Sequence, residues 1–175
     1  MLPKPTPAPQ PRNLLANGSP MVRLCLAAVL AAIAAPCFAQ GPNVLSVLPP
    51  ERLVAKAGST AQAKLSVRIQ PGYHANSNTP SDDYLIPMRL TWSTSALEAA
   101  EVVYPKPELE KYSFSDKPLS VYTGSFELLS RFKVPATAAP GQLVLAGKLR
   151  YQACNDRMCL APKTVEVSLP VEVVK

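Results

Sequence analysis

Hydrophobic and polar residues alternate along several stretches of the 175-residue chain. A period of two sends successive side chains to opposite faces and predicts β-strands that are buried on one face. The clearest stretches are residues 65–69, 86–92, 143–151 and 165–173, and the weaker ones are residues 44–48, 100–104, 121–129 and 131–134. No long window carries a convincing helical period. The pattern therefore predicts an all-β chain of about seven to nine short strands.

Turns that contain proline or glycine separate these stretches. Pro87 and Pro170 fall inside strand patterns, so we expect those strands to lie at a sheet edge or to carry a bulge. The connections at residues 71–84 and 105–120 are too long for simple hairpins, and long ordered loops often carry function. Short strands with turn signals at this spacing predict an antiparallel, immunoglobulin-like β-sandwich.

The N-terminal part of the chain has the pattern of a targeting segment. Residues 1–20 are rich in proline and predict a disordered lead. A basic residue then precedes an apolar run at residues 24–35, which is shorter than the roughly 18 to 20 residues that cross a bilayer. Small residues precede a candidate cleavage point after Ala39. The sequence thus predicts a lead and secretory signal peptide at residues 1–39 and one exported domain at residues 40–175.

Composition excludes some classes of protein. Twenty prolines argue against a helical bundle, because proline removes a backbone donor and breaks helix interiors. The net charge of +6 is scattered along the chain, so a nucleic-acid partner is not expected.

Two cysteines, Cys154 and Cys159, remain after the predicted cleavage, between the last two strong strand patterns. They could close into a disulfide if the loop folds back. A bridge across so short a loop stabilises the folded state by roughly 2 kcal/mol through chain entropy, whereas a bridge that closes a loop of about 100 residues contributes nearly 5 kcal/mol. A redox pair needs proximity and access to another protein's sulfur. Spacing alone leaves both a structural and a redox disulfide open. Zinc is not expected, because its sites normally need four ligands and the chain has one histidine.

Two residues of the long loops are further candidates. His74 is either a hydrogen-bonded loop residue or a group that tunes a nearby thiol. Together with Met88 or Met158 it would make a copper site, which is a third hypothesis for the chain. Phe114 lies among polar residues and is either an anchor on the sandwich or a mobile lid over the sulfur atoms.

The cysteine segment carries a family resemblance. Tyr-Gln-Ala-Cys at residues 151–154, followed by Cys-Leu-Ala-Pro at residues 159–162, resembles the N-terminal periplasmic domain of the thiol:disulfide interchange protein DsbD. Residues 114–122 are similar to the cap-loop region of that family, and residues 72–80 to a segment of its stand-alone relatives. The resemblance covers residues 44–174, nearly the whole predicted mature chain.

The resemblance implies an immunoglobulin-like sandwich with a redox-active cysteine pair near one end. Such a domain takes electrons from a thioredoxin-like donor and reduces periplasmic disulfide proteins, and it needs no cofactor or metal. Cys159 would form the mixed disulfides and Cys154 would resolve them. The same resemblance makes Phe114 the cap aromatic and places supporting residues near the pair, namely His74, Asn76 and Tyr151.

The chain departs from the family pattern at two points. The spacer between the cysteines has four residues, where full-length DsbD usually has about five. The acidic pair beside the cap aromatic is not matched, and only Glu110 and Asp116 lie nearby.

We expect neither the eight-helix membrane section nor the thioredoxin-like section of full-length DsbD to follow the domain. The expected donor is therefore a separate thioredoxin-like protein, with a membrane electron carrier as a further partner. The leading hypothesis is an exported carrier of the protein-disulfide reductase type, of the kind used in cytochrome c biogenesis. The alternative is a non-enzymatic β-sandwich binding or assembly module with a structural disulfide.

Overall fold

The computed structural model describes residues 42–93 and 97–175. The predicted lead and signal peptide at residues 1–39 lie outside the described residues. The regular elements in the described part of the chain are all β-strands. Over the same residues, no helix is long and apolar enough to cross a membrane.

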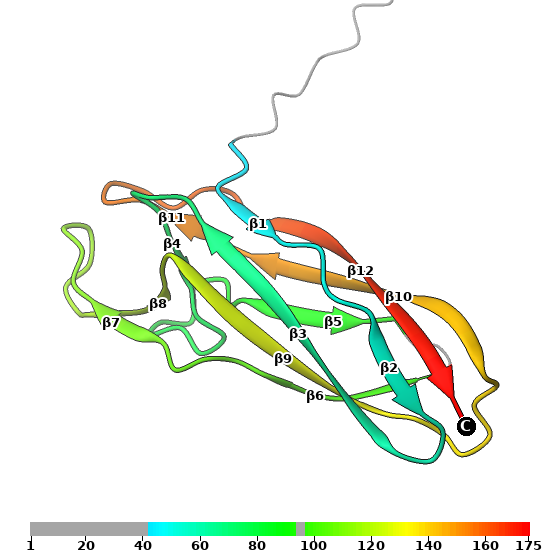
Figure 1. Ribbon diagram of the computed structural model, residues 1–175. Coiled ribbons are helices and arrows are strands. Elements are labelled where there is room, and N and C mark those ends of the chain that lie inside the picture. Colours follow the sequence, from blue (N-terminus) through cyan, green and yellow to red (C-terminus); the bar gives the residue numbers. More distant parts are fainter. Residues whose placement is uncertain (1–41, 94–96) are drawn as a thin grey trace, which may run out of the picture. The chain divides into compact units, whose positions relative to one another are not determined.

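Two four-stranded sheets form a β-sandwich (Figure 1). In sheet A every neighbouring pair is antiparallel, in the order β1 (Leu45–Val47), β3 (Thr60–Ile69), β9 (Ser125–Lys133) and β6 (Glu98–Val103). In sheet B the order is β2 (Leu53–Lys56), β12 (Lys163–Val174), β10 (Gly141–Tyr151) and β5 (Arg89–Trp92). Only β2 runs parallel to its neighbour, β12, among the described strands.

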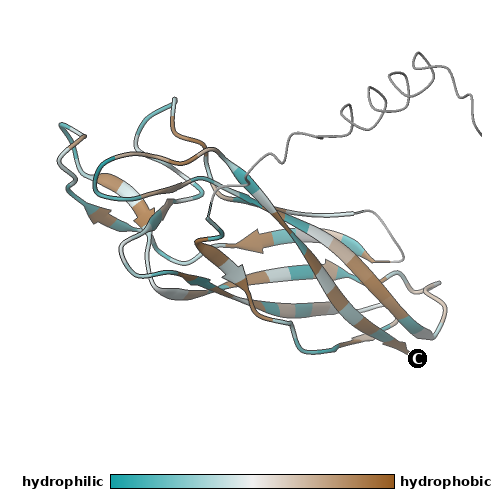
Figure 2. Ribbon diagram, turned by 90° about the horizontal axis from the view of Figure 1, so that it is seen from above, coloured by the Kyte–Doolittle hydropathy of each residue, from teal (hydrophilic) through white to brown (hydrophobic). Residues whose placement is uncertain are grey.

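Alternate residues of the long strands point into the core between the two sheets. In β10 the buried positions are Leu145, Gly147, Leu149 and Tyr151, and their neighbours are exposed. The same alternation is visible as changes of colour along the strands in Figure 2. Position 147 must be a glycine, because a Cβ atom there would lie 2.8 Å from ring carbons of Trp92. A close approach of this kind is a position at which only glycine fits.

A third, smaller sheet, sheet C, lies at one end of the sandwich (Figure 1). Its order is β11 (Ala153–Cys154), β4 (His74–Asn76), β8 (Leu119–Tyr122) and β7 (Glu108–Glu110). Ala75, Tyr122 and Ala153 of this sheet pack into the same buried cluster as Leu65 and Leu149 of the sandwich. Sheet C is therefore anchored to the main core, and it carries Cys154 at its edge.

The predicted all-β sandwich is confirmed, but several boundaries were wrong. The stretch at residues 121–129 contains a break at Gly124, whose φ of 56° lies in the left-handed region that favours glycine. Residues 71–84 and 105–120, expected to be loops, contain β4 and β7.

The expectation of an edge strand or a bulge is confirmed at Pro87 and is wrong at Pro170. Pro87 precedes β5, which is an edge strand. Pro170 lies within β12, an interior strand whose pairing with β10 shows no bulge. Pro170 is tolerated because β2 pairs with β12 only from Val171 onward. At Pro170, β12 therefore has a hydrogen-bonded neighbour, β10, on one side only.

Candidate active site: a disulfide beside an aromatic stack

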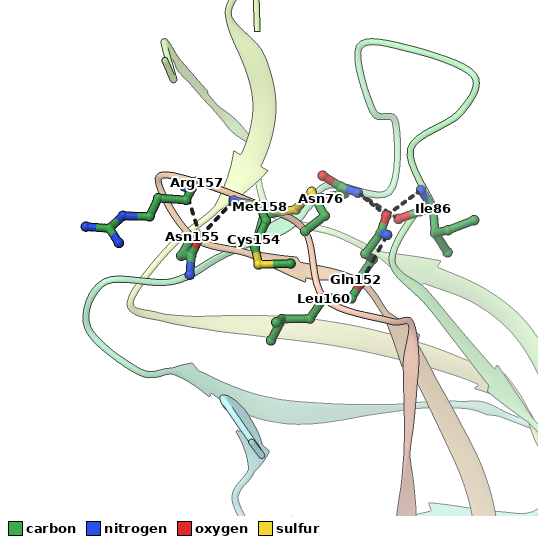
Figure 3. The surroundings of a disulfide bond; sticks show 9 residues. Asn76, Ile86, Gln152, Cys154, Asn155, Arg157, Met158 and Leu160 are labelled. Carbon is green, nitrogen blue, oxygen red and sulfur yellow. Dashed lines mark hydrogen bonds between the residues drawn. A yellow bond between two sulfur atoms is a disulfide. The ribbon is translucent and has the colours of Figure 1, made fainter. Parts of the chain in front are cut away.

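The candidate site begins where β10 ends and the chain crosses from the sandwich into sheet C. Cys154 of β11 and Cys159 form a disulfide, with their Cα atoms 3.9 Å apart. Asn155 closes the turn between them: its amide N–H donates to the Met158 carbonyl at 3.0 Å. Its side-chain Oδ1 accepts the N–H groups of Arg157 and Met158, each at 2.9 Å (Figure 3). The four-residue spacer is thus a tight turn held by its own hydrogen bonds.

The two sulfur-bearing residues differ in accessibility. Cys154 is 0% exposed. Cys159 is half-buried, and the three residues before it are exposed, Met158 at 59%. An approaching molecule would therefore meet Cys159 first. This asymmetry follows from the pairing of β11 with β4, which places Cys154 opposite the buried His74.

An aromatic stack rises from the strand opposite the buried cysteine. His74 pairs directly with Cys154 in the register of β4 and β11 and is 2% exposed. The Tyr112 ring lies on the His74 ring, with centroids 3.9 Å apart and planes 20° apart. Phe114 continues the stack at 5.5 Å from Tyr112 and is 39% exposed. Stacked aromatic ring pairs are favourable, so the segment at residues 111–118 is attached to β4 through its aromatic rings.

Two polar contacts fix the same loop. The Tyr112 hydroxyl donates a hydrogen bond to Oε2 of Glu110. The Ser113 hydroxyl donates to the carbonyl of Asp156, inside the cysteine loop, at 3.0 Å. The second contact joins this segment directly to the turn between the cysteines.

Burial governs the ionisation of the stacked groups. It lowers the pKa of His74, although the nearby Glu110 carboxylate acts in the opposite direction. Burial also raises the pKa of the Tyr112 hydroxyl, with the hydrogen bond to Glu110 acting in the same direction. Near neutral pH the stack therefore holds an uncharged imidazole and a protonated phenol.

Comparison with known proteins decides the family. The family model for "Thiol:disulfide interchange protein DsbD, N-terminal" matches residues 45–170. The chain belongs to this family. The DsbD N-terminal domain is an immunoglobulin-like β-sandwich used in thiol–disulfide interchange, in agreement with the all-β sandwich and its disulfide. A search of curated proteins gave no match.

Solved structures support the fold. The N-terminal periplasmic domain of ScsB from Proteus mirabilis matches with a TM-score of 0.53 and 14% identity. The match covers 73% of this chain and 47% of the ScsB chain, so this chain spans about half the length of that relative.

Two further structures match more weakly. A PapD-like domain of human CEP192 has a TM-score of 0.38 and 9% identity, with 82% of this chain and 94% of that chain covered. A family 123 glycoside hydrolase from Clostridium perfringens has a TM-score of 0.32 and 16% identity, with 75% and 27% covered.

The DsbD-type motif residues predicted from the sequence fall into two groups. Cys154 and Cys159 form the disulfide, and His74 and Phe114 lie in the aromatic stack that begins at the register partner of Cys154. Asn76 and Tyr151 belong to neither and are buried: Asn76 is 0% exposed, and Tyr151 lies in the main core at the end of β10.

Sequence reasoning missed two residues of this DsbD-type site. Tyr112 stands between His74 and Phe114, and the only sign of it was an aromatic two positions before Phe114. Gln152 is part of the Tyr-Gln-Ala-Cys motif, but the motif gave no sign that its side chain makes three hydrogen bonds. Over the described residues, no group of three or more His, Cys, Asp or Glu side chains is placed to bind a metal ion.

The burial of His74 predicts a pH-dependent stability. Because burial lowers the pKa of His74, the unfolded chain binds a proton more readily than the folded one. The stability linked to His74 should be fully present above about pH 6.5, the ordinary value for histidine. It should be lost as the pH falls toward the lowered pKa. His74→Phe keeps an aromatic ring and removes the titration, so the wild type should lose more stability than this variant between pH 7.5 and 5.

Urea unfolding of both oxidised proteins across that range measures the effect. The carboxylates of Glu110 and Asp156, which line the same open hollow as His74 and Tyr112, are retained in both proteins. If the free energies of unfolding of the two proteins changed in parallel with pH, the assignment of this pH dependence to His74 would be refuted.

Proposed function

We propose that this protein is a periplasmic thiol–disulfide carrier that passes electrons from a thioredoxin-like donor to disulfide-bonded proteins through Cys154 and Cys159. The observation that carries the proposal is the unequal exposure of the two cysteines, with Cys154 buried and Cys159 half-buried at the end of an exposed turn. Thiol–disulfide exchange needs one sulfur that visitors can reach and a second sulfur poised to displace them.

The proposed reaction balances without a cofactor. In the reduced protein the Cys159 thiolate attacks a partner disulfide and forms a mixed disulfide, and the partner's other sulfur leaves as a thiolate and takes a proton. The Cys154 thiolate then attacks Sγ of Cys159, which re-forms the internal disulfide and releases the partner's second thiol. Two electrons have moved to the partner, and a donor dithiol restores the pair by the reverse sequence.

The surrounding residues have supporting roles in this proposal. Phe114 and Tyr112 form a lid that a docking partner displaces, with the neutral His74 ring as its base. Asn76, through its hydrogen bonds, and Tyr151, through its burial in the main core, hold the backbone around Cys154 in place. Export with cleavage after Ala39 belongs to the same proposal.

The rival function, a binding module with a purely structural disulfide, is less well supported by the site. The cysteine turn is already closed by the hydrogen bonds of Asn155 and by the bond from the Leu160 amide to the Ala153 carbonyl at 2.8 Å. A bridge across the same turn therefore restrains little that these bonds do not already restrain.

The reduction potential of the pair separates the two functions. The protein is equilibrated in buffers of reduced and oxidised glutathione, and its free thiols are alkylated and counted by mass. A value near −200 mV is expected for a pair that exchanges electrons with other proteins. A value below about −300 mV is typical of a structural disulfide and would overturn the proposal.

A further inference from the structure

We propose that Gln152 is a positioning residue that holds Cys159 against Cys154 and thereby sets how readily the pair closes into a disulfide. The inference rests on the proposed function and concerns its energetics. Gln152 lies between β10 and β11, two residues before Cys154. Its role comes from three hydrogen bonds of its side-chain amide, all drawn in Figure 3.

The acceptor side of this amide is fixed by two donors. Oε1 of Gln152 accepts Nδ2 of Asn76 at 3.0 Å and the backbone N–H of Ile86 at 3.1 Å. Asn76 belongs to β4 and is 0% exposed, and its Nδ2 also donates to the Ile86 carbonyl at 3.2 Å. Because both donors belong to segments outside the cysteine loop, the amide is held in one orientation by the rest of the domain.

The donor side of the amide reaches the far end of the cysteine loop. Nε2 of Gln152 donates to the carbonyl of Leu160, the residue that follows Cys159, at 3.2 Å. The amide of Leu160 donates to the Ala153 carbonyl at 2.8 Å. Both backbone polar groups of Leu160 are thus bonded to the two residues that precede Cys154. None of these bonds involves sulfur, so they can persist when the disulfide is reduced.

The consequence for the redox equilibrium follows from effective concentration. An internal disulfide forms more readily the more closely its two thiols are held together in the reduced protein. Loss of the bond from Gln152 frees the Leu160 carbonyl and lets Cys159 move away from Cys154. We expect the equilibrium constant for oxidation by glutathione to fall about 3- to 10-fold, which is a rise of about 14 to 30 mV at 29.6 mV per tenfold change.

Two variants test this role. Gln152→Glu keeps the shape and the acceptor but replaces the donor to Leu160 with a second acceptor. Gln152→Asn keeps a neutral amide on a side chain that is one methylene too short to span the same partners. Gln62→Glu is the matched control, because Gln62 is exposed on β3 in sheet A and makes the same change of charge.

The readout is the oxidation equilibrium of Cys154 and Cys159 with glutathione for the full chain with Cys25 and Cys37 replaced by alanine, together with the thermal unfolding of each protein in its oxidised and reduced forms. We expect both Gln152 variants to have a more positive potential than the wild type and the Gln62 variant to match the wild type. A purely structural Gln152 would lower the unfolding temperature of the oxidised and reduced forms alike and leave the potential unchanged, which would overturn the inference.

Failure of the proposed function has a different signature. A wild-type potential in the range of structural disulfides would contradict the carrier function, whatever the difference between wild type and variants. If Gln152→Glu does not fold, Gln152→Asn decides the outcome, because it introduces no charge into the half-buried site.

Discussion

Replacing Cys154 with alanine should leave a protein that forms mixed disulfides through Cys159 and cannot resolve them. Replacing Cys159 with alanine should leave a protein that hardly reacts. The physical reason is the exposure of the two residues, since Cys154 is 0% exposed and Cys159 is half-buried beside exposed Met158. Reaction at Cys154 alone requires a local opening of sheet C. An opening that costs about 3 kcal/mol would slow the reaction on the order of 100-fold.

Oxidised glutathione is a suitable probe, and mass spectrometry counts the adducts over time. In a chain whose Cys25 and Cys37 are replaced by alanine, the Cys154→Ala protein should gain one glutathione and keep it. The further replacement of Cys159 by alanine should leave a protein that gains none. Equal rates for the two single variants, or a faster reaction at Cys154, would contradict the assigned order of attack.

Replacing Tyr112 with alanine should make the disulfide much easier for small thiols to reduce. Tyr112 makes both ring contacts that join Phe114 to His74. Each such contact is worth about 0.5 to 1.5 kcal/mol in addition to the burial of apolar area. The two contacts together therefore favour the closed position of the lid by about 1 to 3 kcal/mol. Because each 1.4 kcal/mol is a factor of ten, reduction by dithiothreitol should become about 5- to 140-fold faster.

Two matched variants locate the effect in the rings. Tyr112→Phe keeps both stacking contacts and loses only the hydrogen bond to Glu110, so its rate should stay near that of the wild type. Phe114→Ala removes the outer ring alone and should give an intermediate rate. The lid function would be refuted if Tyr112→Ala were reduced no faster than Tyr112→Phe.

The sequence pattern revealed the long strands because each has one buried face. Alternation in β10 and β12 follows from their place in the sandwich, with the core on one side and solvent on the other. The short strands of sheet C could not be found in this way. All three residues of β4 and all four of β8 are buried, so neither strand has an exposed face to set a period.

The candidate site was predictable only in part, for a similar reason. The two cysteines and their closure were apparent from spacing, but which of them is buried depends on the pairing of β11 with β4, far away in the sequence. Tyr112 and Gln152 were missed because their partners come from distant segments: the His74 ring for the first, and the Ile86 amide for the second. A single sequence shows the residue types of such contacts and not the contacts themselves.

Direct electron exchange with a dithiol protein is the most stringent test of the carrier function. The oxidised protein is mixed with one equivalent of reduced thioredoxin, and alkylation followed by mass spectrometry counts the thiols of each partner at equilibrium. Thioredoxin has a potential of about −270 mV, so a pair near −200 mV should take its electrons with an equilibrium constant of about 200. The account predicts that Cys154 and Cys159 are alkylated and thioredoxin is oxidised. A protein that keeps its disulfide while thioredoxin stays reduced would contradict it.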